Sequence, residues 1–564
     1  MKQTRSRAHR VGIRKLAAVA VVPLLGPGIA HAYKFNTGPD WTINLDTSVQ
    51  YTIGMRMDGR NADIGNNPGN DEGDYKFDKG DLVTNRLQGI LEFGSTYQDR
   101  MGFRASGTGW KDFAYDDDVK NNPNDPAYAA GSTYPSGEYS GRTKKYHIAG
   151  GQLLDSFVWS NFKIGDTPAY IKVGRLSQQW GNGLFFGFAA ISYSQQPTDF
   201  IKGFSQPGSE VKELFLPRTQ VNATAELSPE LSVSAQYFLE YASNRYPEGG
   251  TYLAPSDLLY EGPPSAGIGG LTAGKAYDPK NVNNNFGVKA EWSPTWAGGD
   301  LGFYFRKLDE VQPWTLGEIN DAAFGSGDVH LSYATNVNLY GISYERTFGP
   351  ASVGTEVNMR TDTALNSAFF NGKVGPYREG ARGDIVNVLV NAFLQLGSNA
   401  IWDTGVVLGE VVYTHLDKVT ENADVFNGKG YASCVNAATG GAGGINDGCA
   451  TKNSFALSVL FNPQWLQVLP SWDFAAPISG TFGIAGNPAY AAGAFYAQDS
   501  IVWSAGVNAT YRQKYSFTLQ YQDYYWNPGE VTSTASPLPA YSGGNGPFGL
   551  NDKGWLSLSF KTSF

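Results

Sequence analysis

The sequence has no apolar run that could cross a membrane as a helix. Such a helix needs about 20 residues to span a hydrocarbon core of roughly 30 Å, and the longest run, residues 16–25, has about half that length. A helical membrane protein is therefore excluded. Any contact with a membrane interior has to be made by β-strands.

Histidine and catalytic motifs are also scarce. After residue 32 only His147, His330 and His415 remain, and none has a second ligand at the i+3 or i+4 spacing of a zinc site. No nucleophile elbow, phosphate-binding loop or H-E-x-x-H motif is present. We expect no cofactor, no metal and no enzymatic activity. His415, near the end of the strand pattern 406–416, is the candidate residue if the chain were an enzyme, although a polar wall position is favoured.

The sequence has only two cysteines, Cys434 and Cys449, which enclose a segment rich in Ala, Gly and Asn. In an oxidising compartment this pair predicts a disulfide. Closing a loop of about 15 residues restricts the unfolded chain by roughly 3 kcal/mol. Metal binding is disfavoured because neither cysteine has a histidine nearby.

The first 32 residues have the features of a secretory signal peptide. Basic residues precede the apolar run, and Ala30-His31-Ala32 forms an A-x-A cleavage site. We expect cleavage to leave one domain, residues 33–564. The segment holds six of the 43 basic residues, so 37 basic residues remain against 52 acidic ones, a net charge of −15. Such an acidic chain is not expected to bind nucleic acid.

Apolar and polar residues alternate strictly in many segments, which indicates strands. In residues 231–241, for example, Val233 and Ala235 alternate with Ser234 and Gln236, and only Phe238 departs from the pattern. About eighteen such segments, of about 10 residues each, predict a transmembrane antiparallel β-barrel of 16 or 18 strands.

The connections are of two kinds, very short turns and long polar stretches, which is typical of transmembrane barrels. The Gly-rich stretch 354–383 is expected to form turns. A soluble sandwich or barrel is the alternative, but it would fill its interior with apolar side chains, whereas the second face here carries Asn, Gln, Ser, Thr and charged residues. A closed sheet with lipid outside and water inside satisfies both faces.

The final strand alternates from Leu556 to Phe560 and is followed by the last residue, Phe564. This pattern resembles the recognition strand of bacterial outer-membrane barrels. We therefore expect the barrel assembly machinery to recognise Phe564, and the protein to lie among the lipids of the outer membrane. An ordinary final strand is the alternative.

Residues 177–217 depart from the alternation and are rich in aromatic side chains. An exposed loop of that hydrophobicity is unfavourable, so we expect it to fold into the lumen and narrow it. An external lid or a subunit contact is the alternative. Pores select solutes with rings of charge and aromatic side chains. The residues expected at this constriction are Gln178, Gln179, Trp180, Phe185, Phe186, Asp199, Lys202 and Glu213, with wall charges Arg86, Arg104 and Arg175 opposite them.

Residues 74–86 (DYKFDKGDLVTNR), 174–181 (GRLSQQWG) and 214–218 (LFLPR) resemble the domain-of-unknown-function 1302 family, and the likeness spans nearly the whole mature chain. That family looks like a set of proteobacterial outer-membrane barrels, often linked with the metabolism of hydrophobic compounds, fatty acids and esters. The resemblance implies the fold and the location and suggests a hydrophobic cargo. It offers no catalytic residues to carry over.

These observations together predict an outer-membrane channel for the passive uptake or efflux of a small hydrophobic or aromatic molecule. A general or polar-solute porin is the first alternative. A barrel enzyme acting on lipids or esters is the second. The solute, the direction of transport and the oligomeric state stay open at this point.

Overall fold

The computed structural model describes residues 33–35, 38–124, 132–207, 209, 211–267, 271–321, 326–533 and 538–564. The expected signal peptide, residues 1–32, lies outside these described residues. No helix in the described part of the chain is long and apolar enough to cross a bilayer.

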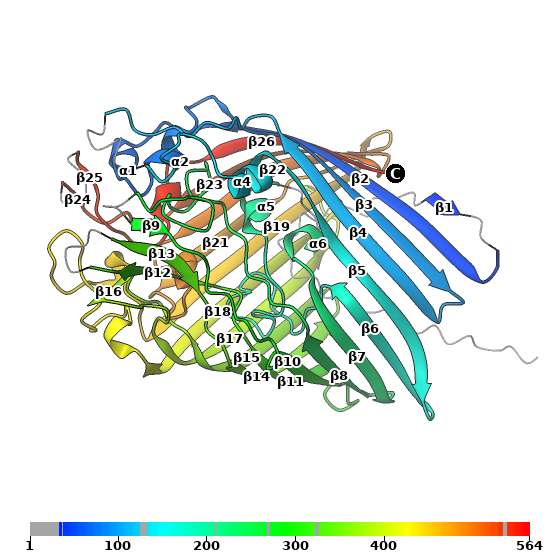
Figure 1. Cartoon of the computed structure of the whole chain (residues 1–564). Helices are drawn as coiled ribbons and strands as arrows, with labels where there is room; N and C mark the ends of the chain where they lie inside the picture. The colour runs from blue at the N-terminus through cyan, green and yellow to red at the C-terminus, as the bar shows by residue number, and fades with distance from the viewer. Residues whose placement is uncertain are drawn as a thin grey trace, which may run out of the picture.

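Eighteen antiparallel strands of the described residues form one closed barrel (Figure 1), which confirms the all-β prediction at the upper expected strand number. The strands of the wall are β1 (Tyr33–Phe35), β2 (Trp41–Arg56), β3 (Leu82–Tyr97), β4 (Met101–Asp112), β5 (Ala149–Ile164), β6 (Thr167–Leu176), β7 (Arg218–Ser228), β8 (Leu231–Phe238), β10 (Phe286–Trp292), β11 (Asp300–Leu308), β14 (Val337–Phe348), β15 (Ala351–Ala364), β17 (Arg382–Leu396), β18 (Thr404–Glu421), β19 (Asn453–Leu469), β20 (Trp472–Ala475), β21 (Ile478–Ala485), β22 (Ile501–Tyr511), β23 (Tyr515–Tyr525) and β26 (Trp555–Ser563).

The 20 strands fill eighteen positions of the wall, because β20 and β21 share one position and β1 continues the position of β26. Pro477 lacks the N–H that a central strand donates, and it separates β20 from β21, which together occupy one position between β19 and β22. The barrel closes where β26 pairs with β2, beginning with Ser48 opposite Ser563. The short β1 pairs with the part of β2 that extends beyond β26.

The long connections gather at one end of the barrel, on the left in Figure 1, and the short turns lie at the other end. Within the long connections, β9, β12, β13 and β16 form a separate four-stranded sheet. The short elements of the connections are α1 (Ala62–Gly65), α2 (Asp71–Tyr75), α4 (Gly141–Thr143), η1 (Lys144–Ile148), α5 (Phe200–Ser205), α6 (Val211–Leu214), β9 (Leu271–Ala273), β12 (Trp314–Ile319), β13 (Gly327–Ser332), β16 (Phe370–Val374), η2 (Ala423–Val425), η3 (Ile445–Asp447), η4 (Gly493–Tyr496), β24 (Val531–Thr532), β25 (Ala540–Tyr541) and η5 (Phe548–Leu550).

The expectation of turns throughout residues 354–383 is wrong where this stretch forms strands: Gly354 lies inside β15, residues 370–374 form β16, and Gly383 lies in β17. A Cβ added to Gly354 would lie 2.7 Å from the Asn391 side chain and 3.2 Å from that of Asn182. Glycine within a strand often marks a place where another segment approaches closely. Here the approaching segment is residues 177–217, so the glycine reflects packing inside the lumen.

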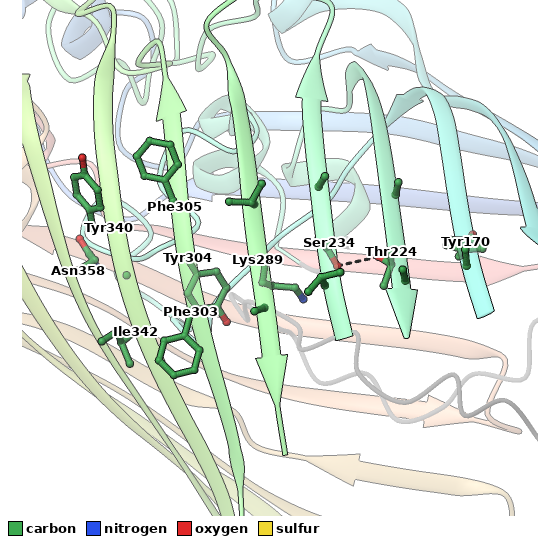
Figure 2. A pocket seen from close by; sticks show the side chains of 18 of the residues that line it. Tyr170, Thr224, Ser234, Lys289, Phe303, Tyr304, Phe305, Tyr340, Ile342 and Asn358 are labelled. Carbon is green, nitrogen blue, oxygen red and sulfur yellow. Dashed lines mark hydrogen bonds between the residues drawn. The ribbon is translucent and has the colours of Figure 1, made fainter. Parts of the chain in front are cut away.

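The wall has an apolar outer face and a polar inner face. On β11 and β14, Phe303, Tyr340 and Ile342 are 42%, 50% and 54% exposed on the outer face (Figure 2). On the inner face, the hydroxyls of Thr224 and Ser234 on neighbouring strands lie 2.9 Å apart. This arrangement suits lipid outside and water inside.

The outer face is hollowed where small side chains cover neighbouring strands from β6 to β10. The hollow encloses about 850 Å³ and is flanked by Phe162 on one side and Phe303 on the other. Its floor carries Ala169, Ala223, Ala225, Ala235 and Ala290. The acyl chains of a bilayer would cover such an apolar surface.

Phe238, which departs from the alternation of β8, faces the lumen and is 1% exposed. The guanidinium carbon of Arg218 lies 4.0 Å from the centroid of its ring, a cation–π arrangement. Phe238 therefore fills an inner position by packing against a wall arginine.

The predicted disulfide is confirmed, since Cys434 and Cys449 are bonded with their Cα atoms 5.8 Å apart. Both cysteines are buried. They lie in the connection between β18 and β19, which also contains η2 and η3. The disulfide thus constrains one of the long connections at the loop end of the barrel.

Candidate functional site

Residues 177–217, hereafter the inward loop, lie inside the barrel between β6 and β7, as the lumen hypothesis predicts. The loop contains α5 and α6 (Figure 1). Helix α5 begins after Asp199, whose side chain accepts a hydrogen bond from the backbone N–H of Lys202 at 3.2 Å. An N-cap aspartate satisfies one of the free N–H groups at the start of a helix.

Two wall carboxylates, Glu356 on β15 and Glu410 on β18, hold one side of the inward loop. The Glu356 side chain accepts from the backbone N–H groups of Asn182, Gly183 (2.7 Å) and Ile191 (2.8 Å). The Glu410 side chain accepts from three consecutive N–H groups of residues 184–186, at 2.8, 2.5 and 2.9 Å. Both carboxylates are buried. We call this pair the carboxylate clamp; charge-assisted bonds of this kind are stronger than neutral ones.

Glycines in the wall make room for the side chains of the inward loop. A Cβ added to Gly287 on β10 would lie 2.8 Å from the ring of Trp180. A Cβ added to Gly341 on β14 would lie 2.7 Å from Ile191. Trp180 and Ile191 are 2% and 0% exposed, so the loop is packed against the wall at these positions.

Polar wall side chains bind carbonyl groups of the same part of the loop. The Asn391 amide donates to the carbonyl of Asn182 at 2.7 Å. Arg306 on β11 donates to the carbonyls of Ile191 and Tyr193 at 2.8 and 2.6 Å. Together with the clamp, these bonds attach the first half of the loop to β11, β15, β17 and β18.

The second half of the loop reaches a different part of the wall. The carbonyl of Pro207 accepts hydrogen bonds from Gln50 on β2 at 3.0 Å and from Ser559 on β26 at 3.4 Å. Strands β2 and β26 lie at the closure of the barrel, far along the sheet from β15 and β18. The inward loop therefore crosses the bore.

Four of the residues expected at the constriction meet in one place, which we call the charged cluster. Asp199 pairs with Arg245 at 2.8 Å, and Lys202 lies 3.7 Å from Glu213. Glu213 also accepts a hydrogen bond from Gln88 on β3. Arg86 and Lys202 approach the same ring, that of Trp110, at 5.1 and 5.5 Å. The charged cluster thus joins the inward loop to β3 and β4.

Next to α5, rings from three connections form an aromatic cluster. Phe200 stacks on Tyr246 with centroids 4.6 Å apart and planes 17° apart, and Tyr246 stacks on Tyr260 at 4.7 Å. Burial raises the pKa of both tyrosine hydroxyls, so they stay neutral near pH 7. Several of these rings, including Phe200 and Phe495, are only half-buried. The cluster consists of Phe188, Phe200, Phe204, Tyr246, Tyr260 and Phe495.

The other expected arginines lie apart from the charged cluster. Arg104 on β4 pairs with Glu92 and lies 3.6 Å from Asp155. Arg175 on β6 pairs with Glu240 at 2.8 Å. Both are wall charges engaged with neighbouring wall or loop carboxylates.

The remaining expected residues belong to the first half of the inward loop. The Gln178 backbone N–H and the Gln179 side chain form hydrogen bonds within the loop. Phe186 is fully buried against Leu389 and Val412, and Phe185 packs beside it. Phe185, Phe186 and Trp180 thus pack the loop against the wall and are separate from the aromatic cluster.

Glu356, Glu410 and Arg306 are functional residues that sequence reasoning missed. Each lies at an inward position of its strand, so the alternation places it in the lumen. The pattern carries no signal for which lumen residues touch the inward loop, because these contacts join strands far apart in the sequence.

His415 lies on the outer face of β18, since its neighbours Thr414 and Leu416 are buried on the inner face. Its Nδ1 lies 2.7 Å from the side-chain oxygen of Asn453, to which the Tyr413 hydroxyl also donates. The side-chain hydrogen bond of His415 is thus made to an amide oxygen.

A closed β-barrel with an apolar outer face, a polar inner face and a loop bonded across its bore defines the chain as a transmembrane barrel with a narrowed lumen. The family model described as "Protein of unknown function (DUF1302)" matches residues 13–564, so the chain belongs to this family. No curated protein matches the chain.

Several solved structures are similar to the chain. OpdK of Pseudomonas aeruginosa, solved with vanillate, is 10% identical with a TM-score of 0.41, covering 93% of this chain and 98% of its own. OccAB4 of Acinetobacter baumannii is 9% identical with a TM-score of 0.41, covering 94% and 99%. OccK2 of Pseudomonas aeruginosa, solved with glucuronate, is 10% identical with a TM-score of 0.39, covering 93% and 97%. A likeness at this level does not assign a solute to this chain.

Proposed function

We propose that this protein is a channel of the bacterial outer membrane for the passive passage of a small hydrophobic or aromatic molecule. The aromatic cluster is the observation that carries the proposal. Half-buried parallel rings beside a loop that crosses the bore offer flat apolar contacts to a solute. We expect the C-terminal strand with Phe564 to direct the barrel to the assembly machinery.

A second candidate, a porin for polar solutes, is favoured by the charged cluster. Arg86, Lys202 and Arg245 stand there against Asp199 and Glu213. Charges of both signs at a constriction orient small polar molecules. The two candidates differ in whether passage depends on rings or on charges.

Single-channel recording in planar bilayers separates the candidates. Indole, a water-soluble aromatic probe, is added at increasing concentration, and the interruptions of the ion current are timed. In the double variant Phe200→Ala, Phe495→Ala we expect these interruptions to shorten by about tenfold, because each lost ring contact contributes roughly 0.5–1.5 kcal/mol.

The matched control is Phe305→Ala, which removes an aromatic ring from the outer face of β11 and should leave the interruptions unchanged. Equal effects of indole on the wild type and on the double variant would contradict the hydrophobic proposal. If sugars pass and Lys202→Gln alters their passage, the polar-solute candidate is favoured. A purified barrel without any current would contradict both.

A further inference from the structure

Arg360 is a buried wall cation without hydrogen bonds. It lies at an inward position of β15 and is 0% exposed. None of its three nitrogens, Nε, Nη1 and Nη2, has a hydrogen-bond partner among the residues that the structure describes. A buried guanidinium whose donors are all unpaired is strongly unfavourable. The site therefore calls for an acceptor beyond those the described side chains supply.

Two tyrosines flank this guanidinium, and a second arginine lies two strands away. Its central carbon lies 3.9 Å from the ring of Tyr193 and 5.4 Å from that of Tyr490. The hydroxyl of Tyr490 is also buried without a partner in the described chain. Arg306 stands in the same row of the sheet, two strands away through Leu339. Its Nη2 is unpaired as well, although its Nη1 binds loop carbonyls.

The carboxylate beside these groups is already engaged. Glu310 accepts from the Tyr193 hydroxyl at 2.8 Å, from the Ala364 N–H at 3.2 Å and from the Thr363 hydroxyl. Within the described residues, neither Arg360 nor Arg306 has a carboxylate oxygen within ion-pair distance. The Arg360 guanidinium and the Tyr490 hydroxyl thus lie close together with free donors, which a further acceptor would satisfy.

We infer that Arg360, together with the Tyr490 hydroxyl, binds one small anionic group inside the barrel. The chemistry fits a halide ion or the carboxylate of a solute, because both accept several hydrogen bonds in a small volume. Tyr490 belongs to the connection between β21 and β22 and covers the guanidinium from that side.

If the anionic group is the carboxylate of a solute, the site takes part in the proposed function, and this part of the inference rests on that function. Tyr193, Tyr490 and Phe188 belong to one hydrophobic cluster, against which Phe200 and Phe495 pack. An aromatic acid with its carboxylate on Arg360 would therefore have its ring in the same cluster. A free halide at Arg360 needs no such connection.

Bromide tests the site directly. Crystals of the full-length protein soaked in sodium bromide should show anomalous density beside Arg360. The thermal midpoint of the detergent-solubilised protein should rise with bromide concentration, because a ligand that binds only the folded state stabilises it. We expect the substitution Arg360→Gln to abolish this dependence. Arg104→Gln, which removes an exposed, acid-paired arginine from the same barrel, should retain it and so corrects for general salt effects.

Benzoate and benzyl alcohol distinguish the two sources. A midpoint that rises with benzoate but with neither bromide nor benzyl alcohol assigns the site to a solute carboxylate, and a rise with bromide assigns it to a free small anion. If neither anion shifts the midpoint of the wild type and no density appears, the inference is overturned.

Two further outcomes keep the test decisive. If Arg360→Gln does not fold, Tyr490→Phe removes one donor while keeping the guanidinium, and a smaller anion-dependent shift is expected. A shift in Tyr490→Phe equal to that of the wild type would count against the site. Because these readouts need no current, the anion site and the proposed channel can fail separately.

Discussion

At the scale of single residues, the inward loop is held mainly through its backbone. The carboxylate clamp of Glu356 and Glu410 binds six N–H groups of residues 182–191. A helix would satisfy such groups internally and a strand through its neighbours, but this segment has neither. Buried backbone donors need partners, so the two wall carboxylates make the irregular conformation possible inside the barrel.

We expect Glu410→Gln to loosen the first half of the inward loop. The amide that replaces one carboxylate oxygen faces N–H donors, and each donor left unpaired costs about 1–3 kcal/mol. Hydrogen exchange of the amides of residues 184–186 should accelerate, and current noise should increase. Glu92→Gln is the control, since Glu92 pairs with Arg104 on the wall. Unchanged exchange at residues 184–186 would show that the clamp is not needed.

A pH effect is expected at His147, outside the wall strands. Burial, and to a smaller extent the charge of Arg86, lowers the pKa of His147 from 6.5 to about 3. Its ring packs against Tyr115, and its Nε2 accepts from the backbone N–H of Glu248 at 3.2 Å. Between these pKa values the unfolded segment binds a proton that the folded one does not, so folding stability falls as the pH drops.

This difference amounts to about 2 kcal/mol between pH 8 and pH 5. Hydrogen exchange of the Glu248 amide, corrected for its intrinsic pH dependence, should therefore show weaker protection at pH 5. His147→Gln removes the titrating group and should remove the acid sensitivity. Retained sensitivity in His147→Gln would place the effect elsewhere.

At the scale of elements, the fit between wall and loop depends on missing side chains as much as on present ones. Gly287, Gly341 and Gly354 lie on β10, β14 and β15, and each faces a residue of the inward loop. The hydrophobic alternation of these strands predicts that such positions face the lumen. The reason for glycine at these positions lies in the tertiary structure, where the inward loop packs against them.

We expect Gly287→Val to displace Trp180. The new side chain would overlap the indole ring, because even a Cβ would lie 2.8 Å from it; overpacking of this kind costs about 1–3 kcal/mol. Near-ultraviolet circular dichroism should report the changed environment of the indole. Gly409→Val is the control, since a Cβ there lies 3.9 Å from its nearest neighbour. Identical spectra for Gly287→Val and the wild type would contradict the packing.

The sequence predicts part of the charged cluster. Asp199, Lys202 and Glu213 were expected from their position in the one segment without alternation, and they do lie together near Arg86. Arg104 and Arg175 are expected as wall charges opposite them, and in the structure each pairs with a carboxylate outside the charged cluster. Strand position decides which wall charges reach the loop, and the sequence pattern does not specify the position of a strand around the barrel.

At the scale of the whole molecule, the inverted sheet makes a prediction about membrane insertion. Phe303→Arg puts a charge on the outer face of β11, where it should cost about 2–4 kcal/mol near the bilayer midplane. Ser232→Arg puts the same charge on the inner face, opposite Glu226 and Glu291, and should be tolerated. The midpoint of urea-induced unfolding in lipid vesicles measures both. Equal destabilisation by the two arginines would argue against the assignment of the faces.

The sequence by itself determined the class of fold, the number of strands to within two, the two faces of the wall, the disulfide and the segment that enters the lumen. All of these follow from local patterns: a period of two, turn residues, and the cost of exposing an aromatic loop. Each involves residues close together in the chain.

Only the tertiary structure decided which wall residues meet the inward loop. Glu356, Glu410, Arg306 and Arg360 each contact loop residues more than 100 positions earlier in the chain, and closure of the barrel brings them together. Pairing around a closed sheet sets these distances. A local pattern shows that a side chain points inward, whereas its partner across the lumen depends on the curvature and register of all the strands between them.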